Sequence, residues 1–185
     1  MRPIKNVISQ IILLIFSVFF LVYGCGYTTH SVMPEGDPTL YVANFVNKIN
    51  VTEEASDKNV YYAYKPGMEI DITREIIDRF IFDGNYKITS QETAHFLLKG
   101  QLVRFERQPL RYDANENITE YRINVVVDIE LHDLEKETIV WTENNFAGES
   151  TYRTSGRFAK SEVTAVKEAI KDLARRVVER TVENW

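Results

Sequence analysis

The sequence predicts an α+β protein, a two-layer α/β sandwich in which two helices pack on one face of a four- to five-stranded mixed sheet. Two segments carry apolar residues at helical spacing, and one long segment is apolar at every second residue. The elements follow the order strand, helix, strands, helix. Two helices that are each apolar on one side are both buried only if they cover the same face of the sheet. We therefore expect the second face of the sheet to remain open.

The first strand signal is a short apolar run from Leu40 to Val46. The first helix is predicted at Met68 to Asp83, between the chain break at Pro66-Gly67 and the turn signal Asp83-Gly84-Asn85. Apolar residues form an unusually wide stripe along this helix, and polar residues fill the opposite arc. The stripe consists of Ile70, Ile77 and Ile81, flanked by Ile72, Ile76 and Phe80.

Four further strands follow the first helix. A brief strand is predicted at Tyr86 to Thr89 and a longer one at Phe96 to Arg107, in which Gly100 marks a bulge or a point of close approach. Residues 121–131 carry the clearest signal, because alternate apolar residues place one face on a core and the other toward water or a partner. A strand restarting at Thr138, and able to continue to residue 148, completes a hairpin with it.

The second helix is expected after a polar stretch, residues 149–160, whose composition is typical of a flexible loop. Ser161 is the candidate N-cap, although the acid follows at Glu162 rather than three residues on, so the full capping box is missing. Apolar residues then recur at three- and four-residue spacing, which predicts a helix with one packed and one solvated side. These residues are Val163, Val166, Ile170, Leu173, Ala174 and Val177.

The N-terminus has the pattern of a bacterial lipoprotein signal. Arg2 and Lys5 precede an apolar run from Ile11 to Tyr23, and Gly24 supplies a small residue before Cys25, the only cysteine in the chain. Cleavage before Cys25 would leave a new N-terminus able to carry acyl chains on its sulfur and amine. An uncleaved transmembrane anchor is the alternative, but the 17 residues from 7 to 23 include polar side chains and fall short of the roughly 20 that span a bilayer.

These features predict three parts of the chain. Residues 1–24 form the signal peptide, residues 25–38 form a lipidated tether rich in glycine and proline, and residues 39–185 form a single domain. Bacterial lipoproteins tend to stay in the inner membrane when Asp follows the lipidated cysteine. Because Gly26 follows here, we expect a lipid anchor in the outer membrane, with the domain on the periplasmic side.

Charge and composition exclude several classes of protein. After removal of residues 1–24 the chain carries 20 basic side chains against 27 acidic ones, a balance that argues against nucleic-acid binding. No second cysteine exists to form a disulfide. The three histidines lack the spacing of a metal site, and no cofactor motif is present. Asp128 and Glu130 share one strand face, but alternate acids on a wet face are usually a solubility feature, so we do not expect an enzyme.

Four basic residues are the candidate binding site. If the strand beginning at Phe96 pairs with the alternating strand, Arg104, Arg107, Arg111 and Arg122 come close together, and their guanidinium groups could bind phosphate or carboxylate oxygens in pairs. The alternative is that nearby acids neutralise the four arginines and no ligand is bound. The acids considered are Glu106, Glu116 and Glu120.

Several short segments, in their order and spacing behind the lipoprotein signal, resemble the LptE family of lipopolysaccharide-assembly lipoproteins. The resemblance covers most of the mature chain. Its segments are Cys25-Gly26-Tyr27, residues 40–47 ending in Phe45-Val46-Asn47, Phe82-Asp83-Gly84-Asn85-Tyr86, residues 94–100, residues 109–113, residues 119–123, Leu131-His132-Asp133, Val140-Trp141 and residues 173–178.

The resemblance implies an outer-membrane lipoprotein that sits in the lumen of the translocon β-barrel LptD, assists its assembly and contacts lipopolysaccharide on its way to the outer leaflet. It implies no catalytic residue and no cofactor. The four arginines are nominated from their predicted clustering and not from the family. Two other functions stay open: an auxiliary lipoprotein of another envelope transport machine, and a periplasmic hydrolase that uses Asp128 and Glu130, which would need an apolar cleft beside them.

Overall fold

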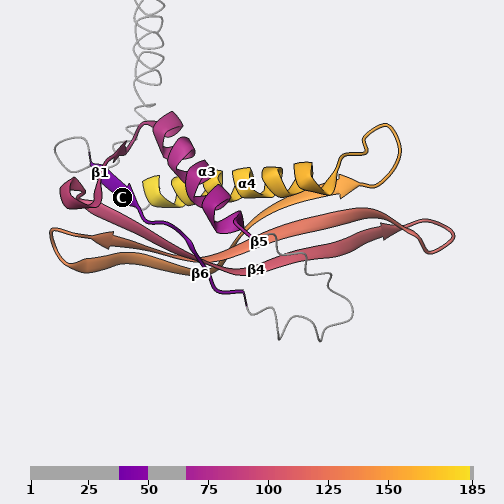
Figure 1. The fold of residues 1–185 in the computed structure, drawn as a ribbon, viewed down its shortest axis with the longest axis horizontal. Coiled ribbons are helices and arrows are strands. Elements are labelled where there is room, and N and C mark those ends of the chain that lie inside the picture. The colour runs from indigo at the N-terminus through magenta and orange to yellow at the C-terminus, as the bar shows by residue number, and fades with distance from the viewer. Residues whose placement is uncertain (1–37, 50–65, 184–185) are drawn as a thin grey trace, which may run out of the picture. The chain divides into compact units, whose positions relative to one another are not determined.

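The computed structural model describes residues 38–49 and 66–183 (Figure 1). The predicted signal peptide, Cys25 and all of the tether but its last residue lie outside these residues. Two helices, a short 3₁₀ turn and six strands are present in the described part of the chain. They are β1 (Thr39–Val42), β2 (Val46–Asn47), α3 (Met68–Asp83), β3 (Lys87–Ile88), η1 (Gln91–Thr93), β4 (Phe96–Tyr112), β5 (Ile118–Asp133), β6 (Thr138–Arg153) and α4 (Glu162–Val182).

The strands form one mixed sheet in the order β3, β1, β4, β5, β6, with β2 also paired to β4. The short strands β1, β2 and β3 pair in parallel, while β4, β5 and β6 are long and antiparallel. The predicted mixed sheet is therefore confirmed. The sheet has six strands rather than four or five, because the chain between Leu40 and Val46 makes two short strands instead of one.

The three long strands extend well beyond the short ones. Of the whole length of β4, only the first part, from Phe96 to Leu102, pairs with β1 and β2. β5 and β6 stay paired with each other as far as Glu120 of β5 and Arg153 of β6. Residues 149–153 are thus strand and not the loop that their polar composition suggested. Within β4, the register shifts between Leu102 and Arg104. Even-numbered residues therefore lie on one side of the sheet before the shift and on the other side after it.

Gly100 lies at a point of close approach. A Cβ atom at this position would lie within 2.5 Å of the Phe45 ring, so only glycine lets this ring pack directly on the strand. The β-bulge begins two residues farther on, at Leu102. Of the two roles that the sequence left open for Gly100, it therefore has the close approach and not the bulge.

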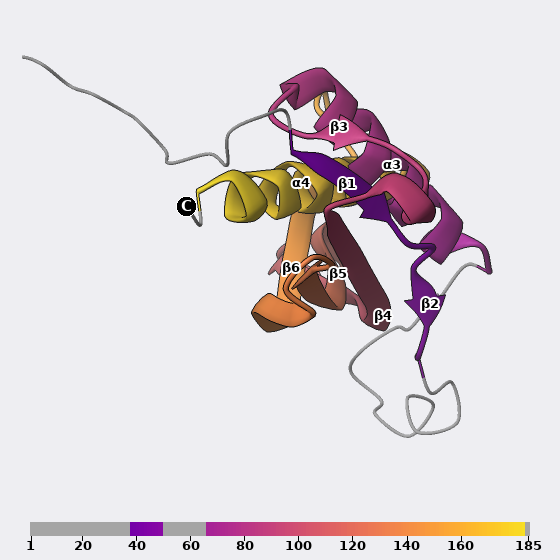
Figure 2. The ribbon, with the colours of Figure 1, turned by 90° about the vertical axis from the view of Figure 1, so that its left-hand side faces the viewer.

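Both helices cover the same face of the sheet, as predicted (Figure 2). Gly148 of β6 is where α4 comes closest, since a Cβ atom there would stand 2.4 Å from the Ala169 carbonyl oxygen. Ser161 caps α4 by accepting a hydrogen bond from the Thr164 N–H at 3.1 Å. One buried core results, formed by the helices and the covered side of the strands.

The wide apolar stripe of α3 is only partly used in packing. The buried residues of α3 are Met68, Ile72, Thr73, Ile76 and Phe80. Ile70 and Ile81 are exposed instead, because they lie on the side of α3 that faces away from the core. Thr73 belongs to the buried side because its hydroxyl accepts a hydrogen bond from the Phe45 N–H at 2.9 Å and donates one to the Glu69 carbonyl. In residues 38–49 and 66–183, no helix is long and apolar enough to cross a membrane.

Candidate functional surface

The open face of β4, β5 and β6 is the candidate functional surface. Along β5, the odd-numbered residues from Ile123 to Leu131 are buried under the helices, and the even-numbered residues point to the other side. These even-numbered residues are polar or charged except Val126, which lies nearly buried between its neighbours. The face is therefore a polar surface built on a rigid sheet.

Charged side chains of the open face form ion pairs, both within a strand and between neighbouring strands. Glu106 of β4 accepts hydrogen bonds from Gln108 at 2.8 Å and from Asn124 of β5 at 3.3 Å, and it pairs with Arg104 at 2.5 Å. Arg122 of β5 lies 3.8 Å from Glu149 of β6. Arg104 and Arg122 thus each have a carboxylate close by, on the same strand or on the neighbouring one.

A second group of charges lies nearer to the hairpin that joins β4 and β5. Glu120 of β5 is the central carboxylate, 3.4 Å from Arg111 of β4 and 3.9 Å from Arg153 of β6. Two guanidinium groups share this one carboxylate, and the side chain of Arg111 is 64% exposed. This group of three side chains consequently carries one more positive than negative charge.

Arg107 lies on the opposite side of the sheet from the other three arginines. Its guanidinium group pairs with Glu162, in the first turn of α4, at 2.5 Å, and stands 5.0 Å from the centre of the Tyr121 ring. Tyr152 donates its hydroxyl to the same Glu162 oxygen at 3.0 Å and stacks on Tyr121. Burial of the ring and this hydrogen bond to a carboxylate raise the pKa of Tyr152 to about 12.

The structure therefore brings Arg104, Arg122 and Arg111 onto one face and separates Arg107 from them. The strand pairing that the sequence predicted is present, with Gln108 opposite Arg122 and Arg111 opposite Glu120. Of the acids considered, Glu106 and Glu120 do pair with arginines. Sequence reasoning missed three partners, Glu149, Arg153 and Glu162. The alternation of Ser150 and Tyr152 with charged residues was the signal for the first two.

Asp128 and Glu130 lie on the open face, where both accept hydrogen bonds. Asp128 accepts one from the Asn145 N–H at 2.8 Å, at a kink where Asn145 has a φ of 56°, and Glu130 pairs with His132 at 2.9 Å. The hollow beside the two carboxylates measures about 240 Å³ and is walled by polar side chains. Lining residues are Lys99, Gly100, Gln101, Asp128, Glu130, Thr142 and Asn144. This is not the apolar cleft that a hydrolase would need to raise a carboxyl pKa.

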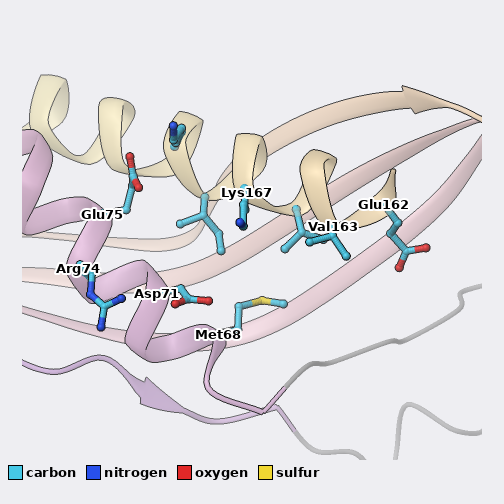
Figure 3. Close-up of a pocket in the computed structure, with 10 residues that line it drawn as sticks. Met68, Asp71, Arg74, Glu75, Glu162, Val163 and Lys167 are labelled. Atoms are coloured by element: carbon cyan, nitrogen blue, oxygen red, sulfur yellow. The ribbon is translucent and has the colours of Figure 1, made fainter. Parts of the chain in front are cut away.

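A larger groove of about 500 Å³ lies between α3 and α4 (Figure 3). Met68 of α3 and Val163 of α4 point into it from opposite sides, and charged side chains of both signs, including Asp71 and Lys167, stand at its edge. Its charges are balanced, so its lining indicates no particular ligand. Across the described residues, no group of three or more histidine, cysteine or acidic side chains could hold a metal ion.

Comparison with known proteins gives similarity in fold and in family. The family model described as lipopolysaccharide-assembly, LptE, matches residues 38–181. A search among curated proteins found no match. A solved protein from Xanthomonas campestris is 12% identical with a TM-score of 0.53, covering 82% of this chain and 90% of its own.

A second solved structure, a hypothetical protein from Chlamydia trachomatis, is 10% identical with a TM-score of 0.52 and covers 80% of this chain and 98% of its own. At such identities these two structures show the fold alone. The family match shows more than the fold, because the family model itself matches nearly all of the folded domain, from β1 to α4. The chain therefore belongs to the LptE lipopolysaccharide-assembly family.

Proposed function

We propose that this protein is an outer-membrane lipoprotein that occupies the lumen of an LptD-like β-barrel, helps it to assemble and assists delivery of lipopolysaccharide to the outer leaflet. The observation that carries the proposal is the family match over residues 38–181, which covers the whole sheet and both helices. In this proposal Cys25 carries the acyl chains that hold the domain at the membrane, and the domain catalyses no reaction.

The open face of β4, β5 and β6 suits such a partner. The lumen of a large outer-membrane barrel is polar, so a plug must present polar groups to it rather than an apolar core. The even-numbered side chains of β5 and their neighbours on β4 and β6 provide these groups. Ion pairs between strands hold the long side chains in fixed positions, which lowers the entropy lost when a partner binds.

The three arginines of the open face are the proposed contacts for lipopolysaccharide phosphates. Arg104, Arg111 and Arg122 each lie near a carboxylate, so a phosphate must compete with an existing ion pair. Surface ion pairs contribute only about 0–1 kcal/mol, and a guanidinium group binds a doubly charged phosphate through two parallel hydrogen bonds. Arg107 is engaged with Glu162 on the covered side, and we leave it out of this proposed contact set.

Co-purification tests the barrel partnership. The wild-type protein, purified from detergent-solubilised outer membranes, should bring with it a large outer-membrane β-barrel, and its depletion should lower both surface lipopolysaccharide and the amount of assembled translocon. Recovery without any barrel, with normal surface lipopolysaccharide after depletion, would instead support an auxiliary lipoprotein of another envelope transport machine.

Matched tryptophan substitutions test which face binds the barrel. Thr151→Trp places a bulky ring on the exposed side of β6, and Lys171→Trp places the same ring on the exposed side of α4. We expect the first to reduce barrel recovery by about tenfold, equivalent to about 1.4 kcal/mol, and the second to leave it unchanged. Equal recovery of the barrel with both variants would show that the open face is not the contact.

Phosphate recognition has its own test. The triple variant Arg104→Ser, Arg111→Ser, Arg122→Ser should bind lipopolysaccharide more weakly while keeping the wild-type unfolding midpoint within a few degrees. Arg175→Ser on α4 is the control, because Arg175 is also ion-paired but lies on the helical side. Unchanged binding by the triple variant, or equal binding of dephosphorylated lipopolysaccharide by the wild type, would contradict the proposed contact.

A further inference from the structure

The N-terminal tether enters the domain at one end of the sheet. Pro38 directly precedes β1, which begins at Thr39. The Lys87 N–H donates to the Pro38 carbonyl at 2.9 Å, and the His95 N–H donates to the Thr39 carbonyl at 3.1 Å. The entry point is therefore held between β3 on one side and β4 on the other, so its position relative to the rest of the sheet is defined.

Apolar side chains stand exposed on the α3 side of this entry point. The last turn of α3 ends at Asp83, four residues before Lys87, and it carries Ile81, 63% exposed, and Phe82, 80% exposed. The guanidinium group of Arg79 lies 5.3 Å from the centre of the Phe82 ring. Leaving a large apolar side chain in water forgoes about 1.5–3 kcal/mol of burial, so two adjacent ones on a helix end suggest a surface that is covered in the assembled state.

A second set of exposed apolar residues lies on the other side of the same entry point. The hairpin joining β5 and β6 is attached here by the Leu134 N–H, which donates to the His95 carbonyl at 2.8 Å, and β1 and this hairpin lie together at the left of Figure 1. Leu134 is 36% exposed, Val140 is 38% exposed and Ile139 is 56% exposed.

We propose that this end of the domain projects from the barrel and rests on the bilayer that holds the lipid anchor, and that an apolar rim inserts into the lipid surface beside the tether. The rim is made of Ile81, Phe82, Leu134, Ile139 and Val140. The inference rests on the proposed lipidation of Cys25. Pro38 lies thirteen positions after Cys25, which limits the distance between lipid and entry point to about 45 Å.

The charges around the rim indicate what kind of membrane contact this is. Lys87 can extend its ammonium group toward lipid phosphates, but Lys136 is paired with Asp133 at 2.8 Å. The acids Asp83, Glu135 and Glu137 lie on the same two segments. Because the charges nearly cancel, binding of the rim comes from apolar insertion and not from attraction to anionic lipid. The contact should therefore persist at high salt, where an electrostatic contact would be screened. A lipid chain and an inserted rim together give the two signals that stable anchoring needs.

Single-site labelling tests the rim in the lipidated full-length mature protein. Phe82→Cys and Phe158→Cys exchange two highly exposed phenylalanines, the second in the loop between β6 and α4. With Cys25 blocked by acyl chains, each variant has one free thiol for an environment-sensitive fluorophore. In vesicles of phosphatidylethanolamine with a minor share of phosphatidylglycerol, a doxyl-labelled lipid should quench the label at position 82 several-fold more than the label at position 158, at low and high salt alike.

Equal quenching at the two positions, or none at position 82, would overturn the rim while leaving the lipid anchor intact, since the protein would still sediment with the vesicles. Two labels per chain and no sedimentation of the wild type with vesicles would instead show that Cys25 is free, which would overturn the anchor and the rim together. Loss of quenching at position 82 on adding salt would show that the contact is electrostatic and not an apolar insertion. This result would also contradict the proposal.

Discussion

The two faces of the long antiparallel strands use the same backbone for different purposes. The covered face is mostly apolar and is packed by α3 and α4, and ionic contacts, among them Arg107 with Glu162 and Tyr152, join the sheet to α4. The open face has the same length of strand but presents charges that are paired within β4 or between neighbouring strands. Stability of the domain therefore depends on one face, which leaves the other free to be selected for binding.

Substitution of Phe105 should show the largest difference in unfolding free energy between the two faces, because Phe105 is almost fully buried on the covered side of β4. Phe105→Ala should lower the free energy of unfolding by about 3–5 kcal/mol, since it removes a ring from the core and leaves a cavity. Gln108→Ala, three residues away on the open side, should change it by less than about 0.5 kcal/mol. Urea denaturation of both variants measures the contrast, and similar losses would mean that the open face also supports the fold.

Ionic groups should show the same contrast on a smaller scale. Glu162→Gln removes the charge that holds Arg107 and accepts from Tyr152, and it should lower the free energy of unfolding by about 1.5–3 kcal/mol. Glu149→Gln, which removes the charge beside Arg122 on the open face, should lower it by less than about 1 kcal/mol. Equal effects in urea denaturation would contradict the distinction between a structural and a surface ion pair.

Alkaline pH provides a third comparison. The pKa of Tyr152 is about 12 in the folded protein and near 10 in the unfolded chain, so the folded state binds this proton more tightly. The stabilisation is fully present below pH 10 and is lost as the pH rises toward 12. Wild type should thus lose more stability across this interval than Tyr152→Phe does. Parallel curves of unfolding free energy against pH for the two proteins would show that the hydroxyl has no such role.

The smallest effect is expected for the kink on the open face. Asn145 has a φ of 56°, which glycine adopts without strain, so Asn145→Gly should change the free energy of unfolding by less than about 1 kcal/mol. Asp128→Ala removes the acceptor for the Asn145 N–H and should lower it by about 1 kcal/mol. Thermal unfolding of both variants checks the order, and a larger loss for the glycine variant would mean that the Asn145 side chain itself is needed.

Much of the fold could be predicted from local sequence. α3 begins and ends at the predicted residues because Pro66-Gly67 and Gly84 interrupt the chain on either side. β5 follows the predicted alternation, because a strand with one buried face must alternate. The end of β6 was not predicted, since Glu149 and Arg153 read as loop residues and only pairing with β5 holds them in a strand.

The candidate site could be predicted from local sequence less completely than the fold, because it depends more on tertiary structure. A change of parity near Gly100 was visible in the sequence, but the register shift between Leu102 and Arg104 decides that Arg104 lies on the open face and Arg107 on the covered one. The acids that pair with the arginines come from distant parts of the chain, Glu149 on β6 and Glu162 on α4. Spacing along one strand does not contain that information.

By itself, the sequence determined the helices, the alternating strand, the open sheet face and the lipoprotein pattern at the N-terminus, because each depends on residues close together in the chain. Only the tertiary structure decided which arginine faces which carboxylate and which apolar residues of α3 stay exposed beside the tether. Those outcomes depend on strand register and on the line along which a helix meets the sheet, and both are set by packing between segments far apart in sequence.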